Sequence, residues 1–220
     1  MAQSKKKIRF LATGDFHSDM EFVNSIKERI DLDTIDFVLF TGDLSERRDD
    51  FKDLFGIFEG KQIFMVPGNH EGKKQLDILQ EKYKVHLVGN APVKFNDDLV
   101  LFGTNYLSIG PYGISEQDVF ENMVANFQAI EDVPCKIHMS HIPPSDTEIG
   151  EMSPYPFIGG SEASKAFLEH FNPDITICGH IHESSGLEEI VNKTKLVNVG
   201  KTVKVLEFDP EKKKVEVKDK

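Results

Sequence analysis

The alternation of short apolar runs with amphipathic segments is the feature that most restricts how this chain can fold. Apolar runs of strand type cover residues 8–13, 37–40 and 63–66. Helices between and after these runs are expected in segments 18–30, 51–58 and 75–83. Strands separated by helices of this length form parallel strand-helix-strand units, and both faces of such a sheet are covered. We therefore predict an α/β fold.

Two helix starts carry a local sequence signal. Ser18 and Glu21 have the spacing of a capping box, and the apolar residues that follow recur on one helical face. Ser115 and Asp118 have the same spacing and predict the N-terminus of a helix in the second half of the chain. Both serines are expected to accept a hydrogen bond from the first turn of their helix.

The second half of the chain is expected to add antiparallel strands. Segments 93–95 and 99–102, joined by Asn96-Asp97-Asp98, predict a hairpin. The three C-terminal runs predict an antiparallel meander, and Lys212 to Lys214 after them are expected to be solvated. The remaining elements are expected at 137–140 and 175–178 as strands, at 161–171 as a helix, and at 187–191, 196–199 and 203–208 as the meander.

Segment 142–160 has no periodicity and contains several prolines and glycines. Connections of this length in a compact domain are usually functional or mobile. We predict that the segment lacks regular secondary structure and forms a rim of the active site.

Side chains of the metal-binding type directly follow several of the apolar runs. In open α/β sheets, ligands bind in the crevice beyond the carboxyl ends of the strands. Glycines next to these side chains allow the backbone to turn tightly. The side chains placed in this way are Asp15, His17, Asp43, Asn69, His70, Glu71, His141, His180 and His182.

The chemistry of this set restricts the ligand. Carboxylate, imidazole and amide groups suit manganese, iron, zinc, cobalt or nickel better than an ion that prefers thiolate. The residues are too many for one ion, whereas two ions about 3.5–4 Å apart that share a carboxylate would use them all. Capping of the following helices would explain an isolated aspartate, but it does not explain histidines and an asparagine beside glycines at several strand ends.

In chain order, these residues resemble the complete signature of the calcineurin-like metallophosphoesterases. The matching motifs are Asp15-x-His17, Gly42-Asp43, Gly68-Asn69-His70-Glu71, His141 and Gly179-His180-x-His182. The resemblance is to small, single-domain, phosphodiesterase-like members. It implies a four-layer α/β/β/α sandwich with two mixed β-sheets, formed by residues 1–220 as one domain.

The same resemblance implies a role for each residue. Asp15, His17 and His182 would bind one metal ion and Asn69, His141 and His180 the other, with Asp43 as the bridge. His70 is similar to the catalytic histidine of the family, which is not a metal ligand. Glu71 stands where many members have aspartate, so its role beside His70 is open.

The expected activity is hydrolysis of a phosphate ester, most simply a phosphodiester such as a cyclic nucleotide. Two divalent ions, two aspartates and a bridging hydroxide leave a net charge of about +1, which can hold a phosphate ester in an otherwise acidic protein. A metal pair also lowers the pKa of bound water and supplies a hydroxide for in-line attack on phosphorus. Manganese or iron is the favoured metal, and His70 would donate a proton or a hydrogen bond to the developing charge.

Two alternatives remain open at this stage. The first is another phosphoester reaction, by a phosphomonoesterase or a nucleotide pyrophosphatase. The second is a protein-interaction scaffold of the same fold without catalysis; a retromer subunit uses the fold in this way and has lost the catalytic histidine. The presence of His70 and of every ligand favours the enzyme.

Other candidate residues are expected to be structural. His86 and His170 are predicted to lie at the surface, and His138 to belong to a strand. Aromatic residues in the irregular segments could stack on a nucleobase or pack the loops onto the domain; they are Tyr106, Tyr112, Tyr155 and Phe157.

Charge and composition restrict partners and compartment. The formal net charge of −11 disfavours binding to a nucleic-acid polymer. No apolar run approaches the roughly 20 residues of a membrane span, and the N-terminus lacks the features of a signal peptide. Cys135 and Cys178 are predicted to be buried, reduced thiols. We therefore expect a cytoplasmic monomer or homodimer that acts on a small phosphate ester such as a nucleotide and has no membrane partner.

Overall fold

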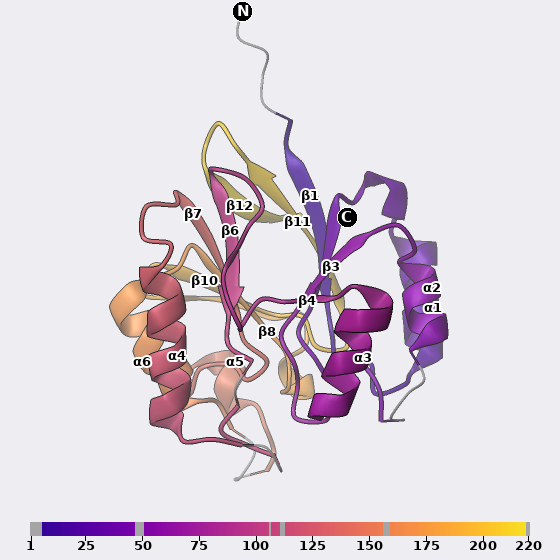
Figure 1. Ribbon diagram of the computed structural model, residues 1–220. Coiled ribbons are helices and arrows are strands. Elements are labelled where there is room, and N and C mark those ends of the chain that lie inside the picture. The colour runs from indigo at the N-terminus through magenta and orange to yellow at the C-terminus, as the bar shows by residue number, and fades with distance from the viewer. Residues whose placement is uncertain (1–5, 47–50, 106, 111–112, 156–158, 219–220) are drawn as a thin grey trace, which may run out of the picture.

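The computed structural model describes residues 6–46, 51–105, 107–110, 113–155 and 159–218. Tyr106, Tyr112 and Phe157, considered above for stacking, lie outside these residues. Two six-stranded mixed sheets form the centre of the molecule (Figure 1). Among the described residues, no helix has both the length and the apolar character that a membrane crossing requires.

The first sheet contains the three strands predicted in the first half of the chain. Its parallel part is β1 to β4, and β11 pairs antiparallel with β1 and with β12. The strand order is β12-β11-β1-β2-β3-β4. The strands are β1 (Ile8–Thr13), β2 (Phe37–Phe40), β3 (Gln62–Met65), β4 (His86–Leu87), β11 (Val203–Asp209) and β12 (Lys214–Lys218).

The second sheet is built around three parallel pairings. Strands β6, β7, β8 and β10 are parallel neighbours, and the antiparallel strands β5 and β9 form its two edges. The predicted hairpin is confirmed as the β5–β6 pair. The strands are β5 (Val93–Lys94), β6 (Leu99–Gly103), β7 (Cys135–Met139), β8 (Ile175–Cys178), β9 (Glu188–Val191) and β10 (Thr194–Asn198).

Helices cover the outer face of each sheet (Figure 1). On the first sheet lie α1 (Met20–Arg29), α2 (Lys52–Ile57) and α3 (Lys73–Tyr83), and on the second lie α4 (Glu116–Gln128) and α6 (Glu162–Phe171). The four-layer α/β/β/α sandwich is therefore confirmed. Short 3₁₀ helices occur at Leu32–Thr34 and His182–Ser184.

Successive side chains of a strand point to opposite faces of its sheet, and this alternation in direction creates the layers. In β1, Phe10 and Ala12 face the second sheet, whereas Leu11 packs against the helices. Between the sheets, the rings of Phe10 and Phe37 stack with their centroids 4.8 Å apart. Because both faces of the central strands are buried, these strands are apolar throughout and lack the polar alternation of a half-exposed strand.

The first helix begins one residue later than predicted. Asp19 is its N-cap and accepts a hydrogen bond from the Phe22 amide. Ser18 instead has a φ of 66°, and its Oγ lies 3.0 Å from Ser45 Oγ. Ser18 therefore links the turn after β1 to the segment after β2. The predicted cap of α4 is confirmed, because Ser115 accepts a hydrogen bond from the Asp118 amide.

The prediction that the three C-terminal strands form one antiparallel meander is wrong. β9 and β10 form an antiparallel pair in the second sheet, but β11 crosses to the first sheet and pairs with β1. The crossing occurs around Gly200, which forms a bridge with Gly14 at the end of β1. Lys212 to Lys214 are exposed as predicted, and Lys214 begins β12, in which Val215 and Val217 pack against the core between the sheets.

Segment 142–160 contains one short helix that was not predicted, α5 (Glu148–Glu151). Thr147 is its N-cap and accepts a hydrogen bond from the Gly150 amide. Glu189 of β9 accepts hydrogen bonds from the Glu148 and Ile149 amides. A long-range contact therefore stabilises a helix that is too short to be recognised from sequence periodicity.

Candidate metal centre

The predicted ligands come together where strands of both sheets end. Asp15 and His17 follow β1, Asp43 follows β2, and Asn69 and His70 follow β3. His141 follows β7, and His180 and His182 follow β8. Because the two sheets pack face to face, the carboxyl ends of their parallel strands meet in one cleft.

Four of these residues adopt a backbone conformation that is uncommon for residues other than glycine. Asp15, His17, Asp43 and His180 have φ values of 52°, 45°, 53° and 71°. Hydrogen bonds between the loops hold them, including Asp15 N–H to the Gly42 carbonyl at 2.9 Å and His17 N–H to the Asp43 carbonyl at 3.0 Å. Such strain collects at functional sites, where the surrounding structure maintains it.

The glycine of the Gly-Asn-His-Glu motif is required for packing. A Cβ atom on Gly68 would overlap the carboxylate of Asp43. The absence of a side chain at this position therefore lets the loop after β3 lie directly on the carboxylate predicted to bridge the metals.

The first group of donor atoms comprises Asp15, His17 and His182, whose ligand atoms lie within 4.8 Å of one another. His182 Nε2 is 3.8 Å from Asp15 Oδ1. The rings of His17 and His182 meet edge to face with their centroids 5.2 Å apart. This group corresponds to one of the two predicted metal positions.

The second group lies on the other side of Asp43. His141 Nε2 is 3.1 Å from Asn69 Oδ1, and the ring centroids of His141 and His180 are 5.0 Å apart. Asp43 Oδ2 lies 3.4 Å from His141 Nε2 and 3.7 Å from His17 Nε2. Asp43 is thus the carboxylate that lies between the two groups.

Two buried polar atoms support the view that this is a metal site. Asp15 Oδ1 and His180 Nε2 are buried and have no hydrogen-bond partner among the described residues. A buried polar atom without a partner is costly, and a bound cation would satisfy both. The residues therefore fit bound metal ions in ligand type and in these unsatisfied atoms.

Burial and neighbouring charges set the protonation of the ligands. Burial alone would lower the pKa of His141, but the carboxylates of Asp43 and Asp15 raise it to about 9. Burial opposes ionisation of Asp43, yet its pKa is low because His141 and the His70 N–H stabilise the carboxylate. Burial, and then His141, lower the pKa of His180 to about 4. His180 is therefore neutral at pH 7, the form in which an imidazole nitrogen binds a metal.

The backbone of Thr41 orients His141, a contact that sequence reasoning missed. The Thr41 carbonyl oxygen lies 2.7 Å from His141 Nδ1 and accepts a hydrogen bond from it. This contact leaves Nε2 directed at Asp43 and Asn69. A backbone carbonyl carries no sequence signal, and the two residues are 100 positions apart.

Glu71 holds the loops that carry the ligands. Its carboxylate accepts hydrogen bonds from the backbone N–H groups of Asp43, Leu44 and Gly68 at 2.7–2.9 Å. Burial and the charge of Asp43 raise the pKa of Glu71, and the three donors counteract this effect. Glu71 therefore contacts the metal site through the backbone around Asp43 and Asn69.

The cleft above these ligands has a volume of about 200 Å³. His70, with 45% of its side chain exposed, lines it together with Ser153 and Tyr155 of segment 142–160. His70 Nε2 is 3.9 Å from Asp43 Oδ2, and its backbone N–H donates to Asp43 Oδ1. The segment predicted to form a rim thus reaches the cleft.

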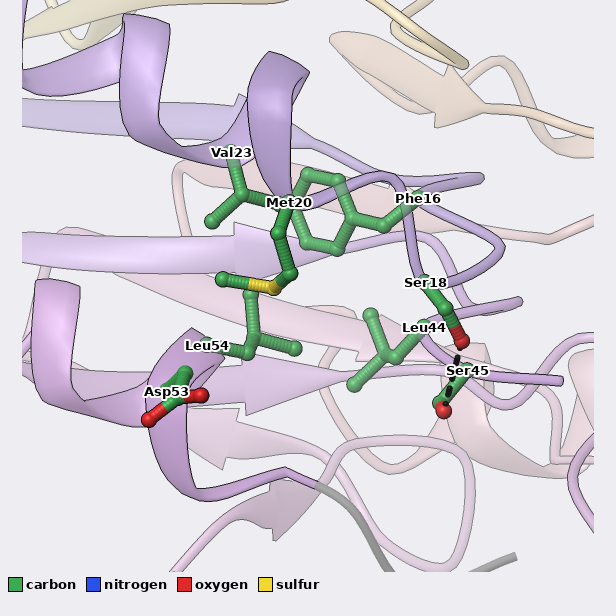
Figure 2. Close-up of a pocket in the computed structure, with 8 residues that line it drawn as sticks. All are labelled: Phe16, Ser18, Met20, Val23, Leu44, Ser45, Asp53 and Leu54. Carbon is green, nitrogen blue, oxygen red and sulfur yellow. Dashed lines mark hydrogen bonds between the residues drawn. The ribbon is translucent and has the colours of Figure 1, made fainter. Parts of the chain in front are cut away.

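A separate hollow of about 110 Å³ lies under the turn that carries the first ligands (Figure 2). Phe16, Met20 and Leu44 supply apolar walls, and Ser18 and Ser45 lie together on one side. None of the predicted metal ligands lines this hollow. The hollow is therefore distinct from the metal centre.

The remaining histidines and the cysteines are placed as predicted. His138 is buried in β7, where its ring lies 5.0 Å from that of Phe102 and 4.9 Å from that of Phe167. His86 and His170 are exposed. Cys135 and Cys178 are buried, free thiols, and burial raises the pKa of both.

Comparison with protein families and curated proteins shows what this chain is similar to. The family model described as calcineurin-like phosphoesterase matches residues 8–184. MJ1162, an uncharacterised protein of Methanocaldococcus jannaschii, is 26% identical over 145 residues. That alignment covers 62% of this chain and 63% of the relative, so the chain spans less than two thirds of the relative's length.

Similar solved structures share the fold at low sequence identity. TT1561 of Thermus thermophilus has a TM-score of 0.70 at 15% identity, over 97% of this chain and 99% of that one. A putative 5'-nucleotidase from Staphylococcus aureus has a TM-score of 0.67 at 18% identity, over 97% of this chain and 53% of that one. Phosphopantetheinyl hydrolase from Mycobacterium tuberculosis has a TM-score of 0.62 at 14% identity, over 88% and 89% of the two chains.

Proposed function

Because the chain belongs to the calcineurin-like phosphoesterase family, we propose that it is a metal-dependent hydrolase of phosphate esters. The observation that carries this proposal is the convergence of the aspartate, histidine and asparagine ligands in one cleft, with Asp15 Oδ1 and His180 Nε2 left without partners. Asp15, His17 and His182 would hold one ion and Asn69, His141 and His180 the other, with Asp43 shared between them.

When bound, the two ions would supply Lewis acidity toward the phosphate oxygens and activate water. The protein's own contribution is positioning. The Thr41 carbonyl fixes the ring of His141, and Glu71 fixes the loops that carry Asp43 and Asn69. These contacts hold the donor atoms in place before the substrate arrives, so little reorganisation is needed during the reaction.

His70 is the group proposed to act on the substrate directly. Its ring is half-exposed in the cleft and packs edge to face on the ring of His17, with a centroid separation of 5.0 Å. From this position it can donate a hydrogen bond or a proton to the leaving oxygen of an ester. A scaffold without catalysis would have no need of an exposed histidine at this point.

For the substrate we propose a small phosphodiester, with a cyclic nucleotide as the example to test first. Manganese or iron is proposed as the metal. The formal net charge of −11 supports a small substrate over a nucleic-acid polymer, because an acidic surface repels a polyanion.

The test is hydrolysis of bis-p-nitrophenyl phosphate and p-nitrophenyl phosphate by protein stripped with a chelator and refilled with manganese. We expect refilling to restore turnover of the diester. Asp43→Asn should lower turnover by at least about 100-fold and reduce the metal content, because both ligand groups lose their common carboxylate. Asp33→Asn, at an exposed carboxylate outside the cleft, is the matched control.

The outcomes of this test separate the candidates. Turnover of the monoester alone would favour a phosphomonoesterase. Two bound metals without turnover of either ester would contradict the proposed hydrolase and support the scaffold.

A further inference from the structure

Tyr155 is an exposed aromatic side chain in the metal cleft. Its exposure is 63%, the cleft that it lines also contains His70 and His182, and no ring contact of Tyr155 occurs among the described residues. A tyrosine that packs a loop onto a domain buries most of its ring, because burial of the ring is what stabilises the loop. The exposure of Tyr155 therefore excludes that role and leaves its ring available to a ligand.

The backbone beside Tyr155 is tied to the rest of the fold at both ends of segment 142–160. Before Tyr155, Glu189 of β9 holds the first amides of α5. At the other end, Ser145 N–H donates to the Ser161 carbonyl at 3.1 Å, and Ser161 N–H donates to the Pro143 carbonyl at 2.8 Å. The chain is therefore held on either side of Tyr155, at Glu148 and Ile149 and at Ser161.

The cleft thus combines two kinds of surface. Its floor holds Asp43, Asn69 and three of the histidines proposed to bind metal, and bound metal ions there would suit a phosphate group. Its rim offers one face or edge of an aromatic ring together with the hydroxyl of Ser153, whose Oγ lies 3.3 Å from the Tyr155 N–H. A ligand that matches both surfaces carries a phosphate at one end and a flat ring at the other.

We propose that Tyr155 contacts the organic group of the substrate by ring stacking, and that the cleft prefers phosphate esters carrying a planar ring, such as a nucleobase, over esters without one. This inference rests on the proposed phosphoesterase function, because the phosphate must bind at the metal centre for the ring to reach Tyr155.

The test measures binding as well as turnover. Adenosine 5'-monophosphate and ribose 5-phosphate share the phosphate and the sugar, and only the former carries a planar aromatic base. Each is titrated calorimetrically into manganese-refilled protein, with phosphate release followed in the same samples. Wild type should bind the adenosine compound more tightly, and Tyr155→Ala should reduce this preference by about 3- to 10-fold.

Three further variants identify the cause. Tyr155→Phe keeps the ring and should keep the preference. Tyr155→Leu keeps apolar bulk without a ring and should lose it. Met152→Ala removes another exposed apolar side chain of the same segment, 41% exposed, and should leave the preference unchanged. Thermal unfolding of each variant verifies that it is folded.

Two results would overturn the inference while leaving the proposed function intact. One is that wild-type protein hydrolyses phosphate esters but binds adenosine 5'-monophosphate and ribose 5-phosphate with equal affinity. The other is an unchanged preference in Tyr155→Ala. If refilled wild type neither hydrolyses the nitrophenyl esters nor binds either probe, the proposed function fails, and this inference fails with it.

Discussion

His70 and Glu71 are neighbours in sequence but have different surroundings. The His70 ring is half-exposed in the cleft, whereas the carboxylate of Glu71 is buried against backbone amides. The side chain of His70 can therefore contact a substrate, whereas the side chain of Glu71 contacts only other parts of the protein. Substitution at the two positions should have different consequences.

For His70→Gln we expect turnover of a phosphate ester to fall by about 10²- to 10⁴-fold, which is the usual contribution of a general acid or base. Metal content should be unchanged, because His70 is not among the ligands proposed for either ion, although its ring lies within 4.8 Å of donor atoms of His17 and Asp43. The measurements are steady-state kinetics and elemental analysis on the same preparation. Loss of metal in proportion to activity would contradict this role.

For Glu71→Gln we expect a loss of stability of about 2–3 kcal/mol. The glutamine amide has one oxygen in place of two, so it cannot accept all three backbone hydrogen bonds, and its NH2 group faces backbone N–H groups that are also donors. Metal affinity should also fall, by about 10- to 100-fold, since the loops carrying Asp43 and Asn69 lose their common anchor. Urea unfolding and competition with a chelator measure the two effects. An unchanged metal affinity would show that these loops hold their positions without Glu71.

At the scale of elements, the contact between α5 and β9 determines where the rim of the cleft lies. α5 has only four residues, too few to be stable by itself, and Glu189 supplies the acceptors that its first amides need. The neighbouring Glu188 points to Lys195 and Lys204 and takes no part in this contact. The strand thus offers a matched pair of glutamates.

We expect Glu189→Ala to increase amide hydrogen exchange in segment 145–155, because α5 loses two acceptors for its N-terminal amides. The KM for a ring-bearing ester should rise more than kcat falls, since the substitution affects the rim and leaves the metal ligands intact. Glu188→Ala removes the ion pairs to Lys195 and Lys204 and serves as the control. Equal exchange in the two variants would contradict the anchoring role.

At the scale of the whole molecule, the core between the sheets holds the two halves of the metal centre together. Residues from β1, β2 and β3 pack against residues from β7 and β8, and the ligands follow these same strands. Outside this core, β7 carries His138 on the face toward α6, buried among aromatic rings. The stability of the fold is therefore linked to the protonation of a histidine outside the site.

Burial lowers the pKa of His138 to about 3, whereas the same group in the unfolded chain has a pKa near 6.5. Between these values the unfolded state binds more protons, so stability is complete above about pH 6.5 and falls as the pH is lowered. The contribution of this one group at pH 5 is a loss of about 2 kcal/mol relative to neutral pH.

In metal-free protein, His138→Gln should therefore lose less stability between pH 7 and pH 5 than wild type, whatever its stability at pH 7. Urea unfolding at the two pH values measures the difference. His170→Gln, at an exposed position, should follow the wild-type profile. Parallel profiles for wild type and His138→Gln would show that His138 does not set this pH dependence.

The sequence by itself determined the α/β class, most strands and helices, and the identity of the residues that come together in the cleft. Apolar runs and helical spacing are local properties, and ligand-type side chains after apolar runs can be read without coordinates. Two local features were missed because the sequence signal was ambiguous or weak. Ser18 and Asp19 are both good N-cap residues, so the start of α1 is predicted one residue too early. The lysines after residue 210 concealed the alternation of Val215 and Val217 in β12.

Only the tertiary structure decided which sheet each C-terminal strand joins, that Glu71 binds the backbone around Asp43, and that Tyr155 is exposed in the cleft. These outcomes depend on contacts between residues far apart in the chain, such as β1 with β11 and β9 with α5. The physical reason is that pairing of a strand, or burial of a ring, is set by the surface that the rest of the fold presents, and local sequence does not encode that surface.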